Sequence, residues 1–82
     1  MEIFNFEDLE LIKKCLRNRG YKLEQDIKDW NRLDWGNIGD LQNMFTNESA
    51  FYETKENYIK MWKEELNKIE ILEKKIEKYE NE

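Results

Sequence analysis

The chain has 82 residues, with 14 Lys and Arg against 19 Asp and Glu, one Cys, and neither His nor Pro. This length allows one small domain, which buries only about 60% of the surface of its unfolded chain and has little apolar material for a deep pocket. Without His, the commonest general bases and metal ligands are missing, so we expect no catalytic residues, no metal site and no cofactor. The formal charge of −5 disfavours direct binding to nucleic acid or to anionic membranes.

The composition predicts an all-α fold. Helix formers such as Glu, Lys and Leu dominate, whereas Val, the commonest strand residue, does not occur. With 39% hydrophobic and 13% aromatic residues, the chain is too apolar for intrinsic disorder. It has no apolar run of about 18 residues that could cross a membrane, no pattern of a secretion signal, and only one Cys. We therefore expect a cytoplasmic protein.

The first predicted helix covers residues 6–33. Asn5 can accept hydrogen bonds from the free N–H groups of the following turn, and Asp8 lies three positions on, as in a capping box, so we expect a helix to begin near Phe6. Apolar residues then recur every three or four positions and predict one apolar face, formed by Phe6, Leu9, Ile12, Leu16, Leu23, Ile27 and Trp30. Gly20 could end a shorter helix or be tolerated inside a longer one. Because the apolar phase is the same on both sides of it, we expect one continuous helix.

Residues 34–48 form the predicted connection, because this segment contains Gly36, Gly39 and several Asn residues, which favour turns. Within it, helical spacing predicts a short helix of one to three turns from Ile38, Leu41, Met44 and Phe45. Asp40 or Asn37 could cap that helix.

The second long helix is predicted over residues 49–80. Its apolar residues follow the three-four alternation of a heptad seam, interrupted by Glu65, and they are Phe51, Tyr58, Trp62, Ile69, Leu72, Ile76 and Tyr79. Two such helices bury their stripes most simply as an antiparallel hairpin, so residues 1–82 are expected to form a single helical domain. Two helices alone make a thin core, and a homodimer that forms a four-helix bundle is the alternative way to cover each seam.

Two features of the first helix have both a structural and a functional interpretation. Cys15, at the edge of the apolar face, is expected to be a small buried hydrophobe, and the alternative is an exposed reactive thiolate. A positive local balance comes from Lys13, Lys14, Arg17, Arg19 and Lys22. We expect these residues to form a solvated face, and the alternative is a docking surface for an acidic partner or for phosphates.

The aromatic residues carry the most functional information, since there are 11 of them and two tryptophans flank the end of the first helix. In one interpretation these two side chains form a small core with Leu41, Phe45 and Phe51. In the other, they belong to an aromatic and Arg patch at a protein interface, with Trp35 and Arg32 as anchors and two Asp as electrostatic contacts. The candidate partner-binding residues are then Trp30, Arg32, Asp34, Trp35 and Asp40.

The missing catalytic residues and the many aromatic and charged side chains lead us to expect a non-enzymatic protein that binds another protein. No family motif is present, but the small size, the bias to Asn, Lys, Ile and Glu and the long hairpin resemble the short proteins carried by bacteriophages and prophages of AT-rich bacteria. That resemblance implies an inhibitor of a host defence protein, of the anti-CRISPR type, which blocks a basic, nucleic-acid-binding partner in the host cytoplasm by its bulk and its acidic surface. The alternative function is a structural or regulatory homo-oligomer held by the heptad seam.

Overall fold

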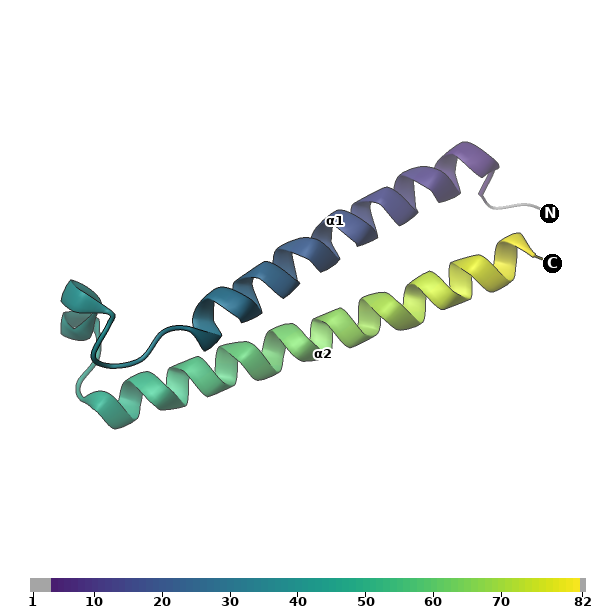
Figure 1. Cartoon of the computed structure of the whole chain (residues 1–82). Helices are drawn as coiled ribbons and strands as arrows, with labels where there is room; N and C mark the ends of the chain where they lie inside the picture. The colour runs from purple at the N-terminus through teal and green to yellow at the C-terminus, as the bar shows by residue number, and fades with distance from the viewer. Residues whose placement is uncertain (1–3, 82) are drawn as a thin grey trace.

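The computed structural model describes residues 4–81 as two long antiparallel helices and a short connection (Figure 1). Helix α1 spans Phe6–Asn31, the short 3₁₀ helix η1 spans Gly39–Met44, and helix α2 spans Glu48–Glu80. We call the end with η1 the closed end, and the end where the termini lie the open end. The predicted all-α helical hairpin is confirmed, with no strand in the described residues. None of the described helices is long and apolar enough to cross a membrane.

Helix α1 begins at the predicted capping box. The N–H of Asp8 donates to Asn5 Oδ1 at 2.8 Å, and the N–H of Asn5 donates to Asp8 Oδ2 at 3.3 Å. The helix ends at Asn31, two residues earlier than predicted. The reason is that the N–H groups of Arg32 and Leu33 bond to carbonyls three residues back, which tightens the last turn and stops the helix.

Gly20 lies inside α1, so the predicted continuous helix is confirmed. Its position is buried, and a Cβ placed on it would lie 3.7 Å from Leu66 Cδ1 on α2. That separation is an ordinary van der Waals contact. Gly20 is therefore a point where the two helices approach each other, and it does not interrupt α1.

The connection contains the predicted short helix, but the predicted cap is wrong. Ile38 occupies the cap position of η1 without a side-chain hydrogen bond, and Gly39, with a φ of +56°, begins the helix in the left-handed region. Asn37 instead accepts the N–H of Asp34 in the preceding turn. Helix α2 then begins one residue earlier than predicted, because Asn47 accepts the N–H of Ala50 and caps it.

The hydrophobic core is small. The buried hydrophobic side chains of the described residues are Leu9, Leu23, Ile38, Phe51, Ile69 and Ile76. Several members of the predicted apolar faces are exposed instead: Phe6, Tyr58, Leu72 and Tyr79. Cys15 is exposed too, so the expectation that it is buried is wrong. A stripe that repeats every 3.5 residues drifts around a helix of 3.6 residues per turn, and one partner helix cannot cover all of it.

Candidate functional site at the closed end

The closed end contains an apolar hollow of about 340 Å³. Ile38 and Phe51 are buried and form its floor, whereas Leu41 and Met44 are exposed at its edge. Met44 is 75% exposed, which is unusual for a large hydrophobic side chain. The walls are completed from α1, the connection and α2 by Trp30, Leu33, Phe45, Thr54 and Tyr58. The tip of the hairpin therefore offers an open apolar pocket.

Phe51 is the centre of the aromatic packing that shapes this end. Its ring centroid lies 5.3 Å from that of Phe45 and 5.0 Å from that of Tyr52, both edge-on, and 6.1 Å from that of Trp35. Such pairs contribute roughly 0.5–1.5 kcal/mol each beyond the area they bury. The backbone of Trp35 is also held, because its N–H donates to Tyr52 Oη at 3.2 Å and its carbonyl accepts from Gln42 Nε2 at 2.6 Å. The irregular loop is thus tied to α2 and to η1.

Trp30 belongs to a second aromatic group on the two long helices. Its ring centroid lies 5.2 Å from Tyr58 and 5.9 Å from Trp62, and those two rings stack on each other at 5.5 Å. Trp30 is half-buried and also lines the hollow. The two tryptophans flanking the end of α1 therefore pack in different groups: Trp35 against Phe51, and Trp30 against the α2 rings.

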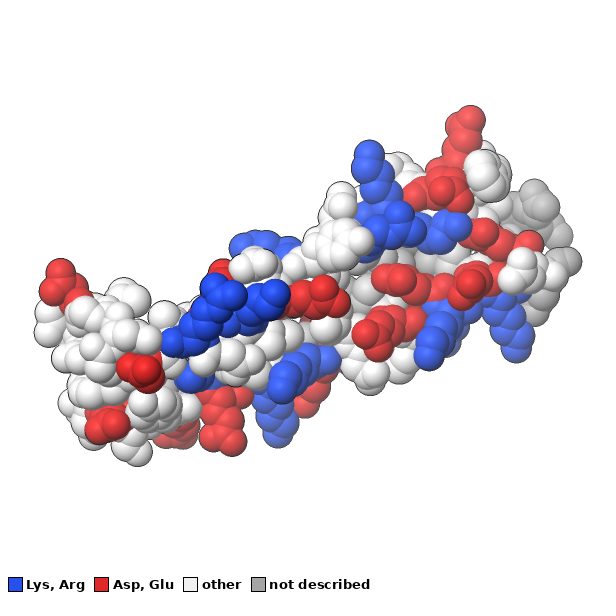
Figure 2. Space-filling model, viewed as in Figure 1, with Lys and Arg blue, Asp and Glu red and all other residues white. Residues whose placement is uncertain are grey.

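The closed end is also the acidic part of the chain. Residues 33–54 contain no Lys or Arg and carry four carboxylates, from Asp34, Asp40, Glu48 and Glu53. The other 60 residues have 15 acids against 14 bases, so residues 33–54 hold four of the five net negative charges. In Figure 2 the closed end, at the left, is mostly white with separate red groups, whereas blue and red alternate along the helices.

The other candidate residues of the sequence analysis lie at the closed end in different settings. Asp34 Oδ1 accepts the N–H of Asn37 at 3.0 Å, so this carboxylate helps to shape the turn. Arg32 is exposed and caps the end of α1, and Asn37 Nδ2 donates to its carbonyl at 2.9 Å. Asp40 is exposed on η1 and has no ion pair within residues 4–81. Of the five candidates, Trp30 is the one that lines the hollow.

Sequence reasoning missed the hollow itself. It placed Leu41 and Met44 on a short helix, but it did not predict that these residues and Phe51 would line one hollow. It assigned Tyr58 to the seam between the helices, where the structure packs it against Trp30, but it did not predict that Tyr58 also lines the hollow. The available signal was the density of apolar residues in a connection this short, which exceeds what a solvated turn needs.

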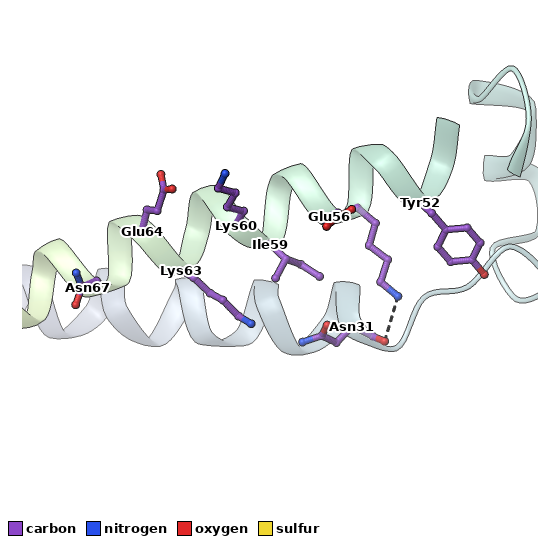
Figure 3. Close-up of a pocket in the computed structure, with 9 residues that line it drawn as sticks. Asn31, Tyr52, Glu56, Ile59, Lys60, Lys63, Glu64 and Asn67 are labelled. Atoms are coloured by element: carbon purple, nitrogen blue, oxygen red, sulfur yellow. Dashed lines mark hydrogen bonds between the residues drawn. The ribbon is translucent and has the colours of Figure 1, made fainter. Parts of the chain in front are cut away.

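Lys55 closes the end of α1 from the opposite helix. Its Nζ donates to the carbonyl of Leu33 at 2.6 Å and to that of Asn31 at 3.4 Å, the contact dashed in Figure 3. A cation at this position complements the negative end of the helix dipole and satisfies carbonyls that have no partner within α1. The same Nζ lies 5.8 Å from the centre of the Tyr52 ring. No local pattern in the sequence marks this lysine, because its partners are more than twenty residues away.

A larger groove of about 720 Å³ runs beside Lys55 along α2 (Figure 3). Ile59 and Lys63 point toward α1 there, whereas Lys60 and Glu64 point away from it. Its charged residues have both signs, and the described residues contain no buried polar side chain that could orient a ligand. We therefore assign the candidate site to the smaller, apolar hollow.

The five basic residues at positions 13–22 of α1 do not form one patch. Three of them are in ion pairs: Lys13 with Glu10 and Glu80, Arg19 with Glu65, and Lys22 with Asp26. These pairs place carboxylates among the positive charges, as expected for a solvated face.

Between residues 4 and 81 there is no group of three or more His, Cys, Asp or Glu side chains that could hold a metal ion.

The comparisons with known proteins add no assignment. No protein-family model, curated protein or solved structure matches the chain.

Proposed function

We propose that this chain is a non-enzymatic protein-binding module that holds a basic partner with its closed end. The observation that carries the proposal is that an open apolar hollow occurs at the same end as residues 33–54, a segment with four carboxylates and no Lys or Arg. A hollow of about 340 Å³ lies at the lower end of the size range of ligand pockets, and it suits an apolar side chain of a partner. The carboxylates would attract the positive charges around that side chain.

Met44 is the proposed apolar contact at the edge of the hollow. Covering such a side chain stabilises a complex by roughly 1.5–3 kcal/mol, and the flexible thioether adapts to different partner surfaces. Trp35 and Arg32 are proposed as the neighbouring anchors, since Trp35 is half-buried and held on Phe51 while Arg32 is exposed. Asp40 and Glu53 would act mainly on the rate of association, because both are exposed and therefore screened by salt.

In its sharper form, the proposal is a phage-type inhibitor of a host defence protein. The molecule is 56 Å long and 16 Å across, so its closed end is the tip of a rod. An acidic tip of this kind can enter a basic groove that otherwise binds nucleic acid, with carboxylates in the place of phosphates. Such an inhibitor acts by occupying the groove, and it needs no chemical step.

The test begins with capture of proteins by the tagged full chain from the cells in which it naturally occurs. The affinity of the captured protein is then measured for four variants. Met44→Asp is compared with Tyr21→Asp, since Tyr21 is a similarly exposed apolar residue outside the closed end. Asp40→Asn with Glu53→Gln is compared with the same amide changes at Glu70 and Glu77 on α2.

We expect Met44→Asp to weaken binding at least about thirtyfold, as truncation of a hot spot does, and Tyr21→Asp to leave it unchanged. The closed-end amide variant should slow association and reduce its salt dependence, whereas the α2 amide variant should not. If Met44→Asp binds like the parent chain, or if the affinity is independent of salt, the closed end is not the binding site. A chain that specifically retains no protein would remove the proposed function.

A further inference from the structure

The hairpin exposes more surface than a compact chain of its mass. Its accessible surface is 6775 Å², against about 5,300 Å² expected for a compact monomer of 10.2 kDa. Its radius of gyration is 18.0 Å, against about 12 Å expected for a compact domain of this length. The difference in surface, about 1,450 Å², exceeds the roughly 800 Å² that each partner buries in a standard interface. Among the described residues, twelve large hydrophobic side chains are exposed and six hydrophobic side chains are buried. The extra surface is large enough for an interface with a second copy of the chain, and one flank of α2 is the candidate for that interface.

That flank, which we call the α2 stripe, consists of residues spaced alternately four and three apart: Met61, Glu65, Lys68, Leu72, Lys75 and Tyr79. At 3.6 residues per turn, its members lie roughly 40–120° around the helix from Ile69 on the inner face, and its three apolar members lie at roughly 60–80°. Met61, Leu72 and Tyr79 are 52%, 43% and 41% exposed. Lys68 and Lys75 are exposed as well. The stripe has the period of a coiled-coil seam. Its apolar members are exposed beside α1, whereas Glu65 pairs with Arg19 of α1.

The α2 stripe complements itself when two copies run antiparallel and cross at residue 70. In an antiparallel coiled coil, an a position of one helix faces a d position of the other. This places Met61 opposite Tyr79 of the second copy. Glu65 then faces Lys75, and the methylene stem of Lys68 faces Leu72. A parallel arrangement would instead place each of Glu65, Lys68 and Lys75 opposite its own like charge. The charge pattern therefore selects the antiparallel arrangement.

We propose that the α2 stripe is the interface of an antiparallel homodimer, in which two hairpins form a four-helix assembly. Within one hairpin, Arg19 bonds to Glu65 at 2.8 Å. In the dimer, Lys75 of the second copy joins this pair, so that one carboxylate faces two cations. With the crossing at residue 70, Phe51 of each copy lies about 57 Å from its equivalent, at 1.5 Å per residue. The two acidic closed ends then point in opposite directions and stay free. The dimer forms without any other protein, so its test is independent of the proposed function.

The first test is the mass of the full chain in solution. Sedimentation equilibrium from about 1 to 300 µM covers micromolar dissociation constants, and we expect twice the 10.2 kDa of one chain at the upper end. Leu72→Glu should weaken self-association at least about thirtyfold, with unchanged helicity by circular dichroism, because Leu72 is outside the monomer core. Tyr21→Glu, at an exposed residue outside the stripe, should leave the dimer intact. A helical parent chain that is monomeric at the highest concentration overturns the proposal, and so does a Leu72→Glu chain that still forms dimers.

The second test is the direction of pairing, and it uses a Cys15→Ser background because Cys15 is exposed. Met61→Cys and Tyr79→Cys chains are mixed and oxidised under mild conditions. We expect disulfide-linked species that join the two different chains, and little product from either chain alone. If Met61→Cys links mainly to itself, the pairing is parallel and the proposed arrangement is wrong.

Discussion

The two ends of the hairpin belong to the same pair of helices but are held in different ways. At the closed end, aromatic rings pack around Phe51, and Lys55 on α2 hydrogen-bonds to the carbonyl of Asn31, the last residue of α1, and to that of Leu33 just beyond it. At the open end, aliphatic side chains such as Ile76 are buried, and Lys13 and Glu80 form an ion pair across the helices at 2.8 Å. The closed end thus combines packing with hydrogen bonds to the backbone, whereas the open end depends on a thin aliphatic contact and a solvated ion pair.

This difference follows from the path of the chain. The bonds of Lys55 at the closed end span 22 and 24 residues, whereas the Lys13–Glu80 pair joins residues 67 positions apart. The entropy cost of closing a loop rises with its length, and a solvent-exposed ion pair offsets little of that cost. Local opening should therefore begin at the open end and reach the closed end last.

The largest effect is expected from Phe51→Ala at the closed end. The side chain is 1% exposed and lies against three aromatic rings, so its truncation should cost on the order of 3–5 kcal/mol. That is close to the whole stability of a small domain, and the cooperative melt followed by circular dichroism should be lost or shifted strongly downward. The control is Phe6→Ala at the open end, where the ring is 72% exposed and the change should be within about 0.5 kcal/mol. Equal melting temperatures for the two variants would contradict the difference between the ends.

Two glycine substitutions should have intermediate effects of opposite sign. Gly39→Ala forces an L side chain into the left-handed conformation at the closed end and should cost roughly 1–2 kcal/mol.

Gly20→Ala, midway along α1, has room for the methyl group beside Leu66 and should stabilise by about 1 kcal/mol through helix propensity. Urea denaturation of both variants measures the two values. A loss of stability in Gly20→Ala would mean that Leu66 Cδ1 lies closer to the added methyl group than 3.7 Å.

The smallest effect concerns the ion pair of the open end. Hydrogen bonds to Glu80 and then to Glu10 raise the pKa of Lys13 above the usual lysine value of 10.5. Because the folded pKa lies above the unfolded one, the contribution of Lys13 is complete below pH 10.5 and is lost as the pH rises through the folded value. Lys13→Gln should therefore melt slightly below the parent chain near neutral pH, and the gap should close in strong alkali. A gap that stays constant with pH would show that the pair does not form in solution.

The helices could be predicted because their signals lie close together in the sequence. Asn5 and Asp8 form the predicted capping box, and the constant apolar phase across Gly20 correctly indicates one helix. The cap of η1 could not be predicted in this way. Asn37 could either cap η1 or hydrogen-bond within the preceding turn, and in the structure it exchanges hydrogen bonds with Asp34 in that turn. Competition between neighbouring hydrogen bonds is decided by the path of the whole connection, which residue preferences alone do not specify.

Of the five residues that the sequence suggested for a binding site, Trp30 is the one that lines the hollow. The position of Trp30 and Trp35 in the sequence pointed to the closed end, and both lie there in separate aromatic groups. The hollow depends on how residues of η1 and α2 come together around it, and the exposure of Cys15 depends on the rotation of α1 against α2. Neither property is visible in residue spacing.

The sequence by itself determined which segments are helical, where α1 begins, where α2 begins to within one residue, and that residues 33–54 are acidic, because caps, apolar periodicity and charge are properties of neighbouring residues. Only the tertiary structure decided that Tyr58, Leu72 and Tyr79 remain exposed and that Lys55 reaches the end of α1. The physical reason is that a single helix can cover only a narrow stripe of its partner. Which members of a drifting seam fall inside that stripe is set by the mutual rotation and crossing of two helices, and these exist only once both have packed.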